Sequence, residues 1–276
     1  MELFFDSGAT KCDAILLDDS GHYLRHCTGT GVNATYMSDS DIRNILEGLR
    51  RQTGSEFQRI TFSGAGCGNP ANATRIEAIL RELYNINIGN IEVISDLMGA
   101  CRLLSPGQDG MVAILGTGAS ACLYDGSRIV KQAPSLGYLL GDEGSGTYLG
   151  KLLIQHYLRD ELPQAVAQDF ENECTIDRTE VLRRLYREPA PNRFLASFAR
   201  YLGCHRDIPA LHELIIHGFT DFFQSQVKPL QQDKTHTLHL MGSVAYHFRD
   251  IIGEIGQKNN CSIGNVAASP LDFLQK

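Results

Sequence analysis

The first residues of this chain that could do chemistry are an acidic residue and the turn after it. Apolar Leu3-Phe4-Phe5 predicts a buried strand that ends at Asp6, and a second apolar strand begins near Ala14. The turn between them offers backbone N–H groups and a hydroxyl to an anion, with no bulky side chain in the way. Asp6 suits Mg²⁺, which binds carboxylates together with phosphate oxygens and water. The residues of this turn that could contact a phosphate are Gly8, Ala9, Thr10 and Lys11.

A second turn of the same composition follows the apolar run Met111–Leu115. At an offset of 110 residues Gly8 matches Gly118, Thr10 matches Ser120 and Cys12 matches Cys122. The repeat predicts a duplicated unit with one hairpin tip in each half, and two such tips could hold a triphosphate. Two unrelated β-turns are the alternative interpretation. The candidate phosphate-binding residues of the second tip are Gly116, Thr117, Gly118 and Ser120.

Asp96 is the strongest candidate for a catalytic group. It follows the predicted strand Ile91–Ile94 and precedes a predicted helix, at the strand end where α/β sheets place ligands. A carboxylate there could accept a proton from a hydroxyl that attacks a phosphate. It could equally be a helix N-cap, satisfying the first N–H groups of the helix. The residue pattern by itself leaves both interpretations open.

Four further turns carry polar residues or glycines that suit a ligand. Asp142 precedes Gly144 and Gly146, whose lack of a side chain would let the backbone approach a ligand, although a helix cap fits equally. Asn33 fits an Asx turn as well as a binding role, and Ser63 and Gly64 fit an ordinary strand-to-helix turn. Gly242 and Ser243 form a similar turn between an apolar strand and a helix.

The elements that must position these residues are strands alternating with amphipathic helices. This alternation predicts mixed, largely parallel sheets covered by helices, which is an α/β fold. The polar stretch 105–110 has no periodicity and predicts a boundary between two domains, residues 1–107 and 108–276. The second domain is expected to repeat the opening strands and then to diverge through a helical region from about Gly144 to Lys228.

Composition excludes several classes of partner. The formal charge is −7 and the sequence has no basic run, so we expect no nucleic-acid or membrane partner. The sequence has no apolar stretch of membrane-spanning length, and the first strand reaches Asp6 too soon for a secretory signal. The eight cysteines include no Cys-x-x-Cys pair, which indicates reduced thiols, no cysteine metal site and a cytoplasmic location.

Five stretches, in this order, resemble the motifs of the sugar-kinase, heat-shock-chaperone and actin (ASKHA) superfamily. They are Asp6–Lys11, Ile94–Asp96, Leu115–Ser120, Leu140–Ser145 and Leu240–Ala245. Within that superfamily the chain looks like the N-acetylglucosamine kinase branch of the BadF/BadG ATPases. The resemblance implies a duplicated two-domain fold of the actin-like ATPase, ribonuclease H-like kind, with ATP in the interdomain cleft.

The resemblance also implies an activity: ATP-dependent phosphorylation of an amino sugar, with N-acetylglucosamine converted to N-acetylglucosamine 6-phosphate. Asp96 would be the catalytic base and Asp6 the residue that holds Mg²⁺ with ATP. Gly242 and Ser243 would join the two tips in binding ATP. The implied sugar-binding residues are Asn33, Ser63, Gly64, Asp96, Thr117 and Asp142.

One departure from the family pattern bears on the substrate. Animal members carry a Trp where Leu136 stands, and this chain has no Trp. N-acetylmuramic acid is therefore an alternative acceptor. Two further alternatives are a BadF-type ATPase activator, which binds an iron–sulfur cluster through cysteines, and a sugar sensor without kinase activity. A homodimer is left open.

Overall fold

The computed structural model describes residues 1–231 and 236–275, and its chain divides into two compact units. The first unit comprises Met1–Leu103 together with Ser269–Lys276, and the second comprises Leu104–Ala268. The last eight residues therefore group with the first unit, whereas the sequence placed them in the second domain. Residues 232–235 and 276 of that predicted domain lie outside the described residues, and the boundary at 107/108 stays a prediction.

The first unit is built on a five-stranded mixed sheet of order β3-β2-β1-β4-β5. The first three strands form an antiparallel meander, and β4 and β5 then add in parallel to β1. All parallel strands therefore end at one edge of the sheet. The strands are β1 Glu2–Ser7, β2 Lys11–Leu17, β3 Tyr23–Thr30, β4 Arg59–Gly64 and β5 Ile91–Ser95.

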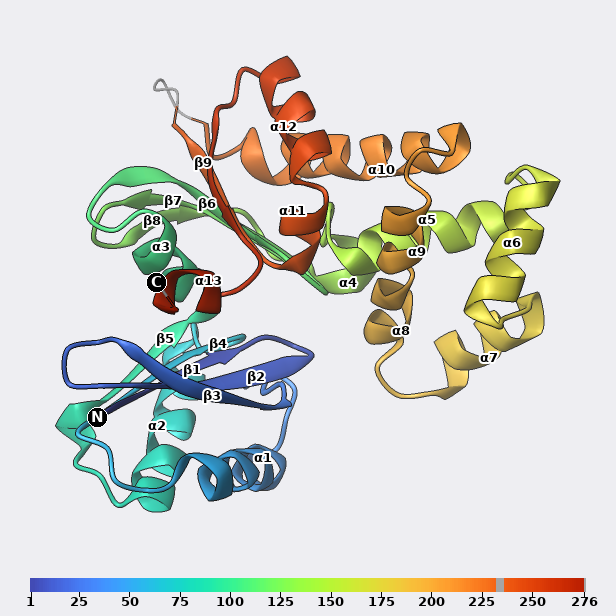
Figure 1. The fold of residues 1–276 in the computed structure, drawn as a ribbon. Helices are drawn as coiled ribbons and strands as arrows, with labels where there is room; N and C mark the ends of the chain where they lie inside the picture. The colour runs from blue at the N-terminus through green and yellow to red at the C-terminus, as the bar shows by residue number, and fades with distance from the viewer. Residues whose placement is uncertain (232–235, 276) are drawn as a thin grey trace. The chain divides into compact units, whose positions relative to one another are not determined.

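The helices α1 (Asp39–Thr53) and α2 (Pro70–Tyr84) cover one face of this sheet (Figure 1). Ser38 caps α1 by accepting the Asp41 N–H, and Asn69 caps α2 by accepting the Ala71 N–H. Their buried residues join Leu3, Phe5 and Phe62 in one hydrophobic core. A short 3-10 helix, Ile88–Asn90, precedes β5, and α3 (Asp96–Leu104) follows it. The remaining helix is α13, Leu271–Leu274.

The second unit repeats this sheet. Read from the edge strand of its meander, as in the first sheet, the order is β8-β7-β6-β9-β10. The strands β6, β7 and β8 form the antiparallel meander, and β9 and β10 then add in parallel to β6. Each of its strands has a counterpart in the first unit at the same place in the order. The predicted duplication is confirmed by this topology. The strands are β6 Asp109–Leu115, β7 Ala119–Asp125, β8 Ile129–Gln132, β9 Leu238–Met241 and β10 Ile263–Ala267.

Between β8 and β9, residues 137–227 are mostly helical, as the sequence predicts. Leu149, Leu153, Phe219 and Phe222 from this segment pack with Leu115 of β6 in a second hydrophobic core. The helical stretch from Ser243 to Lys258 is divided at Phe248 into two helices. The helices of this unit are α4 Gly137–Leu140, α5 Gly146–Leu158, α6 Gln164–Cys174, α7 Arg178–Arg187, α8 Pro191–Ser197, α9 Ala199–Cys204, α10 Pro209–Phe222 with the π-helical Phe223–Val227, α11 Ser243–His247 and α12 Arg249–Lys258.

The predicted α/β class is confirmed by these two five-stranded mixed sheets and their helices. No disulfide joins any of the eight cysteines, all of which lie in the described ranges, and five of them are buried. None of the helices within the described ranges combines the length and apolar character needed to cross a membrane.

Candidate active site

The first hairpin tip is a tight turn fastened by the loop that follows β3. The Gly8 N–H donates to the Lys11 carbonyl at 3.0 Å, so only Ala9 and Thr10 lie between the paired residues. The Gly31 N–H donates to the Thr10 carbonyl at 3.1 Å. A Cβ at Gly31 would overlap the backbone of the tip, whereas a Cβ at Gly8 would meet only the Lys11 carbonyl, at 4.0 Å. The tip is therefore braced on the side of Gly31 and open beside Gly8.

Acidic side chains gather on one face of the sheet behind this tip. Asp6 lies directly opposite Asp13 in the register of β1 and β2, so both side chains point to the same face. Asp13 is 1% exposed, accepts the Thr28 hydroxyl at 2.7 Å and lies 2.7 Å from the Lys11 ammonium. Lys11 is thus paired with Asp13 at the base of the tip.

Asp6 interacts with two other carboxylates and with one ammonium, so acidic groups outnumber basic ones around it. Burial first, and then the carboxylates of Asp96 and Asp13, raise the pKa of Asp6 to about 7, although Lys11 lowers it. A cation bound among these carboxylates would relieve the repulsion between them. The donor set therefore fits Mg²⁺, which prefers carboxylate oxygens.

Asp96 is the first residue of α3, and its neighbour caps the helix. The Ser95 hydroxyl accepts the Met98 N–H at 3.1 Å, which is the contact of an N-cap. The Asp96 carboxylate accepts the adjacent Leu97 N–H at 2.8 Å. Burial raises the pKa of Asp96, while the N–H groups of Leu97 and of Asp96 itself act in the opposite direction. The capping role that the sequence left open for Asp96 belongs to Ser95.

The three predicted sugar-binding residues of β4 and the β3–α1 loop have different surroundings. Ser63 is 1% exposed, and its hydroxyl lies against Gly99 of α3. Gly64 is also buried, and a Cβ there would overlap the Phe62 ring. Asn33 is partly exposed, and its carboxamide oxygen accepts the Thr35 N–H at 2.9 Å. Of these three residues, Asn33 has the side chain that is accessible to a ligand.

The second tip is tighter than the first. The Gly116 N–H donates to the Gly118 carbonyl at 3.0 Å, so Thr117 alone lies between the paired residues. By hydrogen bonding, the counterpart of Gly8 is Gly116 and not Gly118, because the two turns differ in length. Ser120 lies on β7 beyond the turn, where its hydroxyl accepts the Gln132 amide at 3.3 Å.

The start of α5 holds this second tip in place. The Gly146 N–H donates to the Gly116 carbonyl at 2.8 Å, and the Thr147 hydroxyl donates to the Thr117 carbonyl at 2.6 Å. Gly242, with φ +116°, lies so close to β6 that a Cβ would overlap the Leu115 carbonyl. The predicted ATP-binding turn, Gly242 with Ser243 at the start of α11, therefore adjoins the base of the predicted phosphate tip.

Asp142 belongs to the surroundings of the second tip. A Cβ on Gly118 would lie 3.0 Å from the Asp142 Oδ2, and the Asp142 carboxylate accepts the Ala119 N–H. Burial raises the pKa of Asp142, while this hydrogen bond lowers it and Glu143 raises it. Its φ of +59° is uncommon for a residue with a side chain. The Asp142 carboxylate therefore already accepts the Ala119 N–H, which a bound anion could otherwise accept.

The family model described as the BadF/BadG/BcrA/BcrD ATPase family matches residues 5–248. The chain belongs to this family. A search of curated proteins finds no match.

Solved structures support the same fold. A protein of Porphyromonas gingivalis provisionally named N-acetylglucosamine kinase is 34% identical, with TM-score 0.91, over 100% of this chain and 97% of its own. A protein of the same provisional name from Chromobacterium violaceum is 19% identical, with TM-score 0.74, over 99% and 97%. A ROK family glucokinase from Streptomyces griseus in complex with glucose and AMPPNP is 16% identical, with TM-score 0.57, over 99% and 96%. The predicted ASKHA-type fold is thereby confirmed.

Several residues that shape this BadF/BadG-type site escape sequence reasoning. Gly31 and Thr147 contact the two tips, and Gly99 contacts Ser63, only after the chain has folded. Arg75, in the middle of α2, contacts the loop that carries Asn33. The sequence signal for the two glycines was weak. Gly31 lies in a Gly-Thr-Gly sequence, and Gly99 interrupts a segment whose other residues favour a helix.

Proposed function

We propose that this protein is an ATP-dependent kinase of an amino sugar, with N-acetylglucosamine as acceptor and N-acetylglucosamine 6-phosphate as product. The observation that carries the proposal is Asp96, a partly buried carboxylate at the carboxyl end of β5 whose capping role is taken by Ser95. The 34% identity to the Porphyromonas gingivalis protein over essentially both chains supports this choice of substrate.

In the proposed reaction the 6-hydroxyl oxygen of the sugar attacks the γ-phosphorus of ATP. The O6–P bond forms, the bond from the γ-phosphorus to the bridging oxygen breaks, and ADP leaves. Asp96 accepts the hydroxyl proton during the attack, and its raised pKa suits a general base better than an ordinary Asp would. Transfer of this kind depends chiefly on positioning and on neutralising charge.

The other site residues bind the phosphates, the adenosine, Mg²⁺ or the sugar. Gly8–Lys11 and Gly116–Gly118 with Ser120 bind phosphates, and Gly242 and Ser243 receive the adenosine. Asp6 holds Mg²⁺, which when bound neutralises phosphate charge. Asn33, Gly64, Thr117 and Asp142 contact the sugar or its immediate surroundings, and Ser63 acts from the interior of the first unit.

N-acetylmuramic acid is the second acceptor to test. Leu136, where animal relatives carry a Trp, is 57% exposed and leaves room beside a sugar for the lactyl ether of N-acetylmuramic acid.

The alternative function is that of an ATPase activator, since the BadF/BadG family also includes such activators. Only Cys204 of the eight cysteines is exposed, whereas an activator needs cysteines at its surface to hold an iron–sulfur cluster.

The test is a panel of sugars incubated separately with Mg-ATP: N-acetylglucosamine, N-acetylmuramic acid, glucosamine, glucose and N-acetylmannosamine. We expect the highest kcat/KM with N-acetylglucosamine. Asp96→Asn protein purified in parallel excludes a contaminating kinase. Phosphorylation of glucose alone, or of no sugar, contradicts the proposal. Visible absorbance of an iron–sulfur cluster in anaerobically purified protein would favour the activator.

A further inference from the structure

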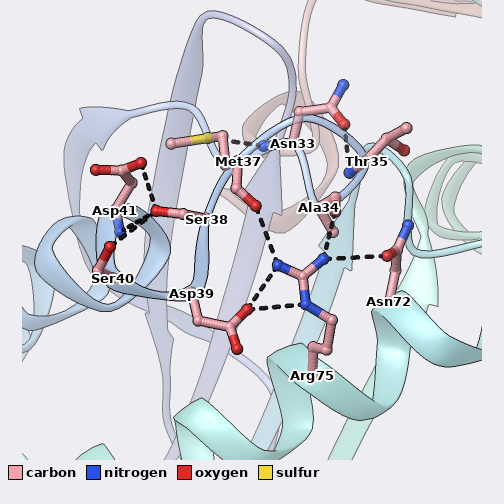
Figure 2. A network of polar contacts seen from close by, with 10 residues as sticks. All are labelled: Asn33, Ala34, Thr35, Met37, Ser38, Asp39, Ser40, Asp41, Asn72 and Arg75. Atoms are coloured by element: carbon pink, nitrogen blue, oxygen red, sulfur yellow. Dashed lines mark hydrogen bonds and ion pairs between the residues drawn. The ribbon is translucent and has the colours of Figure 1, made fainter.

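The loop between β3 and α1 is held by one side chain from α2. Figure 2 shows the Arg75 guanidinium facing this loop, residues 33–38, and the first residue of α1. Arg75 Nη1 donates to the Ala34 carbonyl at 2.9 Å, and Nη2 donates to the Met37 carbonyl at 3.0 Å. Two further bonds, from Nε at 2.8 Å and from Nη2 at 2.6 Å, go to Asp39 Oδ1. Arg75 Nη1 also reaches Asn72 Oδ1 at 3.2 Å.

This arrangement is more than a surface ion pair. An exposed ion pair contributes little, because water screens it and two long side chains must be ordered. The Arg75 guanidinium instead donates hydrogen bonds to two backbone carbonyls near the two ends of the 33–38 loop, those of Ala34 and Met37. The planar five-donor geometry of arginine suits this contact, and a lysine ammonium could not reach the same acceptors together.

A second arginine provides the natural comparison. Arg43 of α1 makes an ion pair with Glu82 of α2, so it joins the same two helices. It differs in one respect, since the Arg43 side chain makes no hydrogen bond or ion pair with the 33–38 loop within the described residues. Removing Arg43 would therefore weaken the pairing of helices without freeing the loop.

Asn33 is the residue whose position the loop determines. Its backbone N–H faces the Met37 sulfur at 3.4 Å, and its carboxamide oxygen is engaged by the Thr35 N–H. A bridge to Ala65 at the end of β4 fixes its backbone. The carboxamide nitrogen points away from this network (Figure 2) and makes no hydrogen bond in the described part of the chain. The nitrogen is thereby available to donate to an oxygen of a ligand.

We propose that Arg75 is a positioning residue for the acceptor sugar: it orders the 33–38 loop and so orients the Asn33 carboxamide nitrogen. The role in sugar binding rests on the proposed kinase activity. The ordering of the loop does not, and it can be measured in the protein without substrate.

The first experiment measures hydrogen exchange in the full chain. Arg75→Lys should raise exchange at the amides of residues 33–38, while Arg43→Lys leaves them unchanged. The Lys variant keeps the charge and the aliphatic stem, so it limits unfolding, and exchange in α1 and α2 reports whether the helices stay intact. Unchanged exchange at 33–38 in Arg75→Lys overturns the proposal, whatever the substrate proves to be.

The second experiment separates the two substrates in steady-state kinetics. Arg75→Lys should raise the KM for the sugar by about 10-fold, the effect of losing roughly one hydrogen bond. The KM for ATP should stay unchanged. In an Asn33→Ala background the same substitution should add little, because the group it positions is gone. A full additional 10-fold loss there, or an equal rise in both KM values, overturns the positioning role. If the wild-type protein phosphorylates no sugar, the proposed function fails and the exchange experiment alone decides the role of Arg75.

Discussion

Gly99 of α3 lies against the Ser63 hydroxyl of β4, so closely that a Cβ at position 99 would overlap the Ser63 oxygen. The two residues set the distance between helix and strand, and Asp96 lies one turn before Gly99 in the same helix. The position of the proposed base therefore depends on a residue without a side chain.

Gly99→Ala should displace α3, lower the free energy of unfolding by about 1–3 kcal/mol as overpacking does, and reduce kcat. Gly48→Ala in α1 is the matched control, since a Cβ there meets nothing within 4 Å. It should stabilise the helix by roughly 0.5–1 kcal/mol. Urea unfolding and steady-state kinetics measure both. Adding Ser63→Gly to Gly99→Ala should recover part of the lost free energy of unfolding, and absence of any rescue would refute the steric explanation.

Asp96 and its neighbour Ser95 should separate catalysis from stability. Asp96→Asn should reduce kcat by about 10²–10⁴-fold, as loss of a general base does, while calorimetry shows nucleotide and sugar binding retained. Ser95→Ala removes the cap and should cost about 0.5–2 kcal/mol of stability, with a much smaller effect on kcat. Near-normal turnover by Asp96→Asn would mean that this carboxylate is not the base.

The first tip should tolerate a side chain at Gly8 structurally but not functionally. Gly8→Val leaves the fold intact because the nearest atom to its Cβ is 4.0 Å away. The branched side chain blocks phosphate, and the loss of one charge-assisted hydrogen bond, worth roughly 1.5–3 kcal/mol, should weaken ATP binding about 10-fold or more. Gly89→Val, at an exposed site with nothing within 4 Å of the Cβ, is the control. Normal ATP binding by folded Gly8→Val in calorimetry would remove this tip from the nucleotide site.

His239 should make the protein less stable in mild acid. Burial lowers the pKa of His239 below its usual 6.5, and its Nδ1 accepts the Asn265 N–H at 3.0 Å, which requires the neutral ring. The unfolded state therefore binds the proton more tightly than the folded state. The contribution to stability is fully present above pH 6.5 and is lost as the pH falls through the lower folded-state pKa. His239→Gln should flatten this part of the pH dependence of Tm, whereas His22→Gln, at an exposed site, should not. An unchanged pH profile in His239→Gln would contradict this origin.

The sequence by itself determined the α/β class and the duplication. Apolar runs that break into Gly/Thr turns recur in the two halves because each half builds the same meander, and strand periodicity is a local property. It also marked Asp6, Asp96 and Asn33, since acidic and amide residues beside strand ends are visible without a fold.

The tertiary structure decided which residues meet. Offset counting matched Gly8 with Gly118, but hydrogen bonding matches Gly8 with Gly116, because the two turns enclose different numbers of residues. Asp142 adjoins the second tip, and Ser63 is buried under Gly99, because side-chain direction follows from sheet register and helix packing. Arg75 reaches the Asn33 loop across 42 positions of sequence (75 minus 33) only because α2 packs beside α1. Contacts over such separations depend on how the elements pack, and a local pattern does not contain that information.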